Sequence, residues 1–266
     1  AGAGVSRISL GLQSAVDEER KALGRRAGVK EAAASVRLAG AAGIQNLSLD
    51  LMLGIPGQTA ESLRRSIDFC TQAGVCHISA YLLKIEEGTP FAQRRASLVL
   101  PNEDTVCDLY EQACEELEAA GFQQYEISNF ARHGFESRHN LKYWNAEEYL
   151  GLGASAHSFL GGKRFFYPRD RNAFLRGEGP IQDGEGGSFE EYAMLRMRLA
   201  DGLIESLARQ RYGCGIPPYM RESARRMEQY GLTSQDEDGI RLTRKGFLLS
   251  NTVIAELLYP AGGTAG

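Results

Sequence analysis

Several features that would assign a protein to a broad class are missing from this chain of 266 residues. There is no excess of basic residues, because the formal net charge is −4, and this argues against bulk binding to nucleic acid or to an anionic membrane. No apolar run approaches the roughly 20 residues of a membrane-spanning helix. The sequence does not show the basic start followed by an apolar stretch that would indicate a secretory signal. The sequence therefore predicts a protein with no transmembrane segment and no nucleic-acid partner.

Cysteine is scarce, and its spacing offers no metal site. The five cysteines include neither C-x-x-C nor C-x-x-x-C-x-x-C, the spacings that hold zinc or an iron–sulfur cluster. Cys70 and Cys114 fall on apolar stripes of predicted helices, which is typical of buried thiols. An odd number of cysteines favours free thiols in a reducing compartment, so we expect a cytoplasmic protein.

The chain does contain three strand patterns in which polar and apolar residues alternate. They cover residues 7–13, 46–53 and 77–83, and helical patterns separate them. This order predicts a parallel sheet in an α/β domain. Strands of a parallel sheet are usually apolar on both faces, so the single polar face predicts a cavity that holds water or a ligand. Asp50 matters most there, since a mid-strand carboxylate is rarely buried without a partner.

Three parts follow one another along the chain. Residues 1–128 alternate strands with helices and predict part of a (β/α) barrel, with a fourth strand at 122–128. Residues 129–187 form an irregular, aromatic-rich extension that ends in a Gly/Glu/Asp-rich linker at 177–187. Residues 188–266 are mainly helical, with a small hairpin and a closing helix. That last pattern is typical of a winged-helix-like module.

Candidate site residues gather near the carboxyl ends of the first two strands. Gln13 and Arg25 stand at and after the end of the first strand, where α/β barrels collect functional groups. A solvated charge at a helix end is the competing interpretation of Arg25. Asp50 can accept hydrogen bonds from ribose hydroxyls or an amine, with a structural ion pair to Arg7 as the alternative. The glycine loop at 54–57 brings backbone N–H groups near a ligand, although a tight structural turn explains it nearly as well.

A second candidate lies in the aromatic-rich extension. His139 and Tyr143 stand four residues apart, so on a helix they share one face, and both residue types ligate haem iron. Trp144 and Tyr149 flank the pair, and packing in a core is the competing interpretation. His157 ends a run of small residues that allows close backbone approach, and for it we expect a core histidine.

Taken together, these motifs resemble a known family. The segments 7–13, 50–59 and 77–90 resemble the fourth, fifth and sixth strand regions of radical S-adenosylmethionine (SAM) proteins of the oxygen-independent coproporphyrinogen III oxidase group. Y-E-I-S-N-F-A at 125–131 and H-N-L-K-Y-W at 139–144 are similar to the haem-chaperone branch of that group, the HemW-like proteins. The similarity covers nearly the whole chain.

The resemblance implies a fold, ligands and partners. The fold would be the C-terminal portion of a partial parallel (β/α)6 barrel, followed by a helical module. Gln13, Arg25 and Asp50 match family positions that contact SAM. His139 and Tyr143 match the H-N-x-x-Y motif that is tied to haem binding in the chaperone branch. Haem or porphyrin would be the ligand, and a haem-accepting protein would be a further partner.

One departure from the family decides how the function is predicted. The family's cluster cysteines precede the region where this chain begins at Ala1, so we expect a fragment that lacks the [4Fe–4S] ligands and is not catalytic by itself. The predicted function is haem chaperoning or trafficking, and the alternative is an oxygen-independent coproporphyrinogen III oxidase. A third hypothesis, independent of the resemblance, is a sugar- or phosphate-handling enzyme with Asp50 as acid–base group. It lacks a clear second carboxylate or lysine in the predicted cavity.

Overall fold

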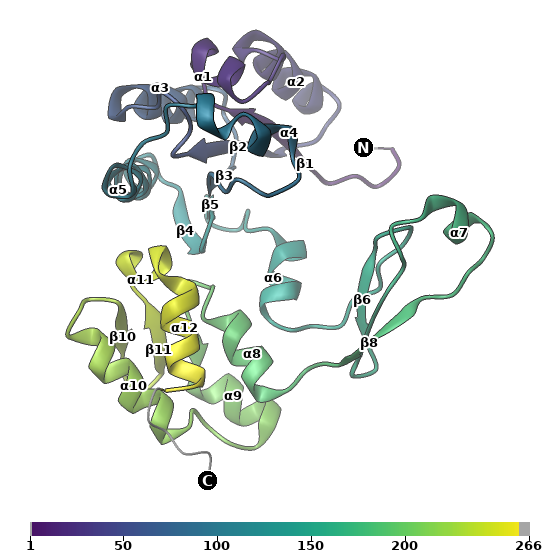
Figure 1. Ribbon diagram of the computed structural model, residues 1–266, viewed down its shortest axis with the longest axis vertical. Coiled ribbons are helices and arrows are strands. Elements are labelled where there is room, and N and C mark those ends of the chain that lie inside the picture. Colours follow the sequence, from purple (N-terminus) through teal and green to yellow (C-terminus); the bar gives the residue numbers. More distant parts are fainter. Residues whose placement is uncertain (1, 261–266) are drawn as a thin grey trace. The chain divides into compact units, whose positions relative to one another are not determined.

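The computed structural model of the chain describes residues 2–260, which form two compact units that divide between Glu136 and Ser137 (Figure 1). In chain order, unit 1 consists of β1 (Arg7–Gln13), α1 (Asp17–Ala22), α2 (Val29–Ala41), β2 (Asn46–Leu53), α3 (Ala60–Gln72), β3 (His77–Leu82), α4 (Pro90–Gln93), a 3₁₀ turn (Arg95–Ser97), α5 (Glu103–Ala119), β4 (Gln123–Glu126) and β5 (Asn129–Ala131).

Unit 2 contains the remaining elements. They are α6 (Arg138–Trp144), β6 (His157–Leu160), β7 (Lys163–Phe166), α7 (Arg171–Leu175), β8 (Ile181–Glu185), α8 (Phe189–Arg196), β9 (Leu203–Ile204), α9 (Glu205–Tyr212), α10 (Pro218–Glu228), β10 (Thr233–Gln235), β11 (Gly239–Leu242), α11 (Arg244–Leu248) and α12 (Ser250–Leu258). In the described part of the chain, no helix has the length and apolar character to cross a membrane.

The sheet of unit 1 has one apolar and one polar face. Its strand order is β1-β2-β3-β5-β4, and β1, β2 and β3 run parallel, as the alternating pattern predicts. Leu49, Leu51 and Leu53 of β2 are buried, and β2 contacts α2, α3 and α5. Each such leucine contributes about 2 kcal/mol of hydrophobic stabilisation. Asp50 alternates with these leucines, so its side chain belongs to the opposite, polar face.

The last strands of this sheet differ from the prediction of one parallel strand at 122–128. β4 ends at Glu126, the chain turns at once, and β5 returns antiparallel between β3 and β4. The side-chain amide of Asn129 donates to the Glu126 carboxylate across this turn, and both residues are buried. The described residues therefore form an open sheet and no closed barrel, in agreement with the partial barrel that the sequence predicts.

Local signals in unit 1 act as the sequence indicates. The Thr59 hydroxyl accepts from the Ser62 backbone N–H at 3.2 Å and caps α3, which satisfies one of the free donors at the helix start. Cys70 and Cys114 are buried, as predicted for apolar stripes. Burial raises the pKa of the Cys70 thiol, so it stays protonated and apolar in character.

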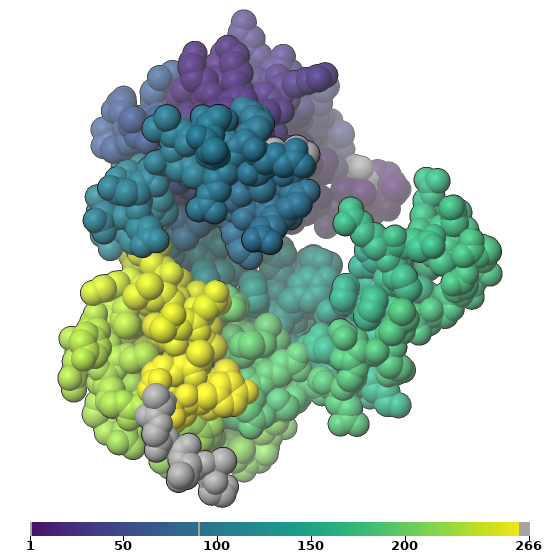
Figure 2. Space-filling view, viewed as in Figure 1, coloured from purple at the N-terminus to yellow at the C-terminus, as the bar shows by residue number. Residues whose placement is uncertain are grey.

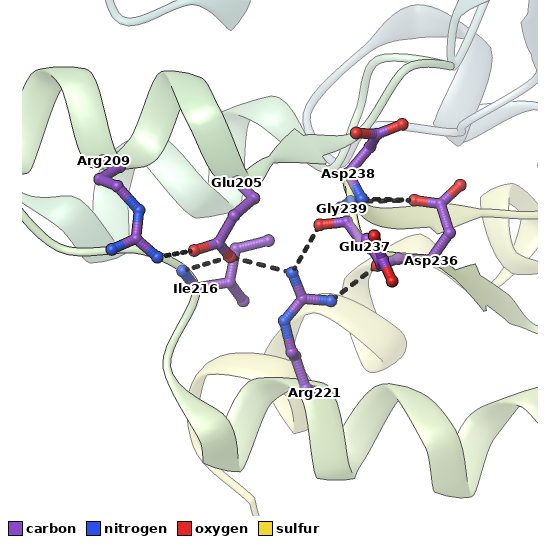
Figure 3. A network of polar contacts seen from close by, with 8 residues as sticks. All are labelled: Glu205, Arg209, Ile216, Arg221, Asp236, Glu237, Asp238 and Gly239. Atoms are coloured by element: carbon purple, nitrogen blue, oxygen red, sulfur yellow. Dashed lines mark hydrogen bonds and ion pairs between the residues drawn. The ribbon is translucent and has the colours of Figure 1, made fainter.

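The C-terminal part of unit 2 has a winged-helix-like order, which confirms the predicted module. The elements run α8, β9, α9, α10, β10, β11, and β11 pairs antiparallel with both β9 and β10. Glu205 at the start of α9 joins these parts, because its carboxylate accepts from Arg209 at 2.7 Å, from Arg221 at 2.9 Å and from the Ile216 N–H at 3.0 Å (Figure 3). Buried Val253 and Leu257 hold α12 against the module.

A second sheet forms where the sequence predicts an irregular extension and a linker. β6, β7 and β8 make a three-stranded antiparallel sheet, coloured green where it lies at the surface in Figure 2. Strand β8 lies inside the predicted linker at 177–187, and all five of its residues are exposed. A strand exposed on both faces needs no alternation of polar and apolar residues, so its sequence, Ile-Gln-Asp-Gly-Glu, resembles a loop.

Candidate functional site

The polar face of unit 1 holds Asp50 beside Ser9. The Ser9 hydroxyl donates to the Asp50 carboxylate at 2.7 Å, and Asp50 is paired in the sheet with Gly11 on one side and Ser79 on the other. Arg7 does not form the ion pair considered above, since it donates to Asn46 at 2.8 Å instead. Asp50 is only half-buried, so its carboxylate remains accessible from the polar face.

Gln13 ends β1 in a left-handed backbone conformation that residues other than glycine rarely adopt. Its φ of 69° is left-handed, its side chain is buried, and the register of β1 against β2 shifts between Gly11 and Gln13. The side chain turns back over Gly11, where an added Cβ would lie 2.7 Å from the Gln13 Nε2 atom. Such backbone strain costs roughly 1–3 kcal/mol and is concentrated at functional sites.

A buried polar cluster holds the chain immediately after Gln13. The Ser14 hydroxyl donates to Glu19 at 2.5 Å, and the Ser14 carbonyl accepts from Arg20 at 2.6 Å. The Ala15 N–H donates to the Ser66 hydroxyl at 2.9 Å, which ties the loop to α3. Glu19 and Arg20 are both 3% exposed. Together these contacts fix the loop in one conformation and so hold the strained end of β1 in place.

Arg25 and the glycine loop are placed differently from Gln13 and Asp50. The structure brings Gln13 and Asp50 onto neighbouring strands, but Arg25 lies exposed after α1, with its backbone N–H bonded to the Arg20 carbonyl at 2.9 Å. In the glycine loop, the Gly54 N–H donates to the Gln58 side chain at 2.7 Å. That N–H is therefore used within the loop itself, which supports the interpretation of the loop as a tight structural turn.

Sequence reasoning missed a buried histidine on the same face. His77 is 1% exposed, its Nδ1 lies 2.8 Å from the Ser48 hydroxyl, and its Nε2 lies 2.9 Å from the Tyr125 hydroxyl. Burial, helped by the positive charge of Arg7, lowers the pKa of His77 to about 3. The sequence did contain a signal for this buried pair, because Ser48 and His77 occupy polar positions of adjacent predicted strands.

In unit 2, α6 presents the histidine–tyrosine pair that the sequence singled out. The Tyr143 hydroxyl lies 3.0 Å from His139 Nε2, and the two rings meet edge to face at 87° with centroids 4.9 Å apart. His139 is exposed, and Tyr143 is half-buried. The rings of Tyr143 and Tyr149 also meet edge to face, with centroids 4.5 Å apart. The pair shares a helix face, as predicted, and the exposed imidazole is accessible to a large ligand.

His157 is not the core histidine that the sequence predicted. It is exposed and stacks on Phe166 with ring centroids 5.1 Å apart. The close backbone approach expected for the preceding small residues is real, since a Cβ on Gly151 would lie 2.2 Å from the His157 carbonyl oxygen. The imidazole thus lies on the sheet surface, while the backbone of its residue makes the tight contact.

Metal ligands do not gather in either unit. Among residues 2–260, no group of three or more His, Cys, Asp or Glu side chains could hold a metal ion. All five cysteines are free thiols, and Cys70, Cys76 and Cys114 are buried. The donor set of this chain therefore does not fit an iron–sulfur cluster.

Comparisons with known proteins now assign the chain. A radical SAM superfamily profile matches residues 1–70, and a HemN C-terminal domain profile matches residues 189–249. Over 266 aligned residues the chain is 35% identical to heme chaperone HemW of Bacillus subtilis (strain 168), covering 96% of this chain and 70% of that protein. The chain belongs to the HemW family. HemW of Mycobacterium tuberculosis (strain ATCC 25618 / H37Rv) is 37% identical, with 96% of this chain and 66% of that protein covered.

A solved structure supports the fold of this HemW family member. Coproporphyrinogen III oxidase (HemN) from Escherichia coli, described as a radical SAM enzyme, matches with a TM-score of 0.77 at 20% identity, over 98% of this chain and 65% of that chain. The chain spans about two thirds of the length of the HemW proteins named above. Radical SAM membership implies SAM and a [4Fe–4S] cluster in full-length members of the family.

Proposed function

We propose that the chain is the haem-holding part of a haem chaperone and that α6 supplies the side chains that contact haem. The observation that carries this proposal is the His139–Tyr143 pair, in which two ligand-competent groups lie 3.0 Å apart. The edge-on contact with Tyr149 adds an aromatic wall of the kind that packs against a porphyrin. The HemW relatives carry the printed name heme chaperone, which supports the same assignment.

We further propose that Gln13, Asp50 and Arg25 contact SAM at the carboxyl ends of β1 and β2. The half-buried Asp50 carboxylate is suited to accept hydrogen bonds from ribose hydroxyls. The strained, buried Gln13 at the neighbouring strand end supports a ligand-facing role. Bound SAM supplies a sulfonium centre. The cysteines of this chain do not fit the cluster that would cleave it, so no radical step is assigned to these residues.

The partners follow from the proposed role. A chaperone must pass its haem on, so a haem-accepting protein is proposed as the second partner, and the cytoplasm as the location. Decarboxylation of coproporphyrinogen is the alternative function, and the H-N-L-K-Y motif at residues 139–143 favours the chaperone over it.

A haem titration tests the proposal. The unsubstituted chain and the double variant His139→Ala, Tyr143→Phe are titrated with ferric haem while the Soret band and a thermal melt are recorded. Haem binding through the pair predicts weaker uptake and a shifted Soret band in the double variant, with a nearly unchanged melting temperature. Packing predicts the opposite, an earlier melt with unchanged haem affinity.

A matched control uses the same residue types at exposed positions. His133→Ala with Tyr230→Phe should bind haem like the unsubstituted chain, because both side chains are exposed and neither residue belongs to α6. Unchanged haem affinity in a folded His139/Tyr143 double variant would remove both residues from the site.

A further inference from the structure

The end of α6 is a strained position that needs support from outside the helix. After Trp144 and Asn145 the chain reaches Ala146, which is 2% exposed and has a left-handed φ of 49°. The Ala146 N–H donates to the Tyr143 carbonyl at 3.0 Å, and the Glu147 N–H donates to the Lys142 carbonyl at 2.9 Å, which closes the helix. Glycine is the usual residue in this conformation, and a side chain there costs roughly 1–2 kcal/mol.

Arg211 of α9 holds this strained end directly. Its guanidinium donates to the Asn145 carbonyl at 2.6 Å and to the Ala146 carbonyl at 2.5 Å. The same group lies 5.1 Å from the ring centre of Tyr192 and 5.6 Å from that of Tyr212. The planar fork thus reaches two consecutive carbonyls that the end of a helix leaves without partners, and the aromatic rings restrict its orientation.

Arg196 of α8 holds the same end from a second direction. It is 3% exposed, and its guanidinium donates to the Asn145 side chain at 2.7 Å and to the Gly202 carbonyl at 2.9 Å. Its ion pair with Asp201 at 2.8 Å balances the buried charge. The end of α6 is therefore bound to α8 through Arg196, and the same guanidinium is anchored to the turn that precedes β9.

We infer that Arg196 and Arg211 are positioning residues for the proposed haem pair. This inference rests on the proposed function of α6. A helix of seven residues is too short to be stable by itself, so outside contacts must set its orientation. His139 lies at its start and Tyr143 near its end, three residues before Ala146. Any rotation or unwinding at the clamped end moves the Tyr143 hydroxyl away from the His139 imidazole.

The test compares arginine with lysine at one clamp position. Arg211→Lys keeps the charge but loses the fork that reaches both carbonyls. The chain, this variant and the control Arg225→Lys are titrated with ferric haem, and the electron paramagnetic resonance spectrum of the bound haem is recorded. Amide hydrogen exchange of α6 without haem and a thermal melt accompany the titration. Arg225 is an exposed residue of α10, so its replacement controls for the loss of a guanidinium elsewhere in unit 2.

The expected result is about tenfold weaker haem binding by Arg211→Lys, an altered haem spectrum and faster exchange of the α6 amides, with a melting temperature close to that of the chain. Arg225→Lys should match the chain in all four measurements. Normal haem affinity and spectrum in a folded Arg211→Lys would overturn the inference. If the unsubstituted chain binds no haem, the proposed function fails. In that case, unchanged exchange of the α6 amides in Arg211→Lys would also refute the proposal that Arg211 holds α6. Faster exchange would show instead that Arg211 supports the helix structurally.

Discussion

The Nε2 atom of His77 lies 2.9 Å from the hydroxyl oxygen of Tyr125, inside the polar face of the first sheet. The other ring nitrogen lies 2.8 Å from the Ser48 hydroxyl, so both nitrogens of this buried imidazole have partners. Burial and the charge of Arg7 lower the pKa of His77 to about 3, so the folded chain holds the imidazole neutral.

This neutral histidine makes the stability of unit 1 depend on pH. The unfolded chain binds a proton at about pH 6.5, whereas the folded chain resists it down to about pH 3. The stabilisation is therefore complete above pH 6.5 and is lost as the pH falls toward 3, by about 1.4 kcal/mol for each pH unit. Urea unfolding at pH 7.5 and 5.5 should show a smaller loss in His77→Gln than in the chain. An equal loss in both would contradict the prediction, and His133→Gln is the exposed control.

The contacts of Glu205 predict that unit 2 loses stability in acid. Burial raises the pKa of Glu205, but hydrogen bonds from Arg221, the Ile216 N–H and Arg209 outweigh it and hold the value below 4.5. The stabilisation is present above the unfolded value of 4.5 and disappears as the pH falls through the lower folded value. Glu205→Gln should melt a few degrees earlier than the chain at pH 7, and the difference should shrink as the pH falls below 4.5. Glu222→Gln, at an exposed position of α10, should melt like the chain at both pH values.

Asp50 should decide the affinity for SAM. Removing the carboxylate by Asp50→Ala deletes the acceptor for ribose hydroxyls, and we expect at least about tenfold weaker binding by isothermal titration calorimetry. Asp68→Ala removes an exposed carboxylate of α3 and should leave the affinity unchanged. Equal affinities for Asp50→Ala and the chain would exclude Asp50 from the site. Ser9→Ala should have a smaller effect, because Ser9 only orients the carboxylate.

The left-handed Ala146 predicts a stabilising substitution. Ala146→Gly relieves the strain of a side chain at φ 49°, and this outweighs the extra flexibility of the unfolded chain by about 1 kcal/mol. The same change at Ala255, an exposed helical residue of α12, should destabilise by about 1 kcal/mol. Thermal melts of the two variants should therefore shift in opposite directions. A shift of the same sign in both would mean that the conformation of Ala146 is not strained.

The sequence predicts those elements of unit 1 that bury one face. The bounds of β2 and β3 match the predicted strands to within one residue, and α3 begins directly after the capping Thr59, because strand patterns and caps leave a clear local record in the residue order. The antiparallel strand β5 was not predicted, since only two residues separate Glu126 from Asn129 and the turn contains no glycine or proline. The interaction that closes the turn joins two side chains and has no periodic signature.

The candidate sites also differ in how far the sequence alone predicts them. Pairing of His139 with Tyr143 follows from their spacing on one helix, and the sequence alone predicts it. Contacts between Arg211 and the end of α6 join residues 65 and 66 positions apart, so only the folded chain reveals them. The strained conformation of Gln13 is likewise hidden, because glutamine shows no preference for a left-handed backbone.

The division of the chain between Glu136 and Ser137 has a consequence for how such a protein can change over generations. Gln13 and Asp50 lie before it, whereas His139, Tyr143 and the arginines that hold their helix lie after it. The contacts described above for α6 all come from within its own unit. A lineage can therefore alter residues of the first unit while it keeps these contacts of α6, because both partners of each contact lie in the second unit.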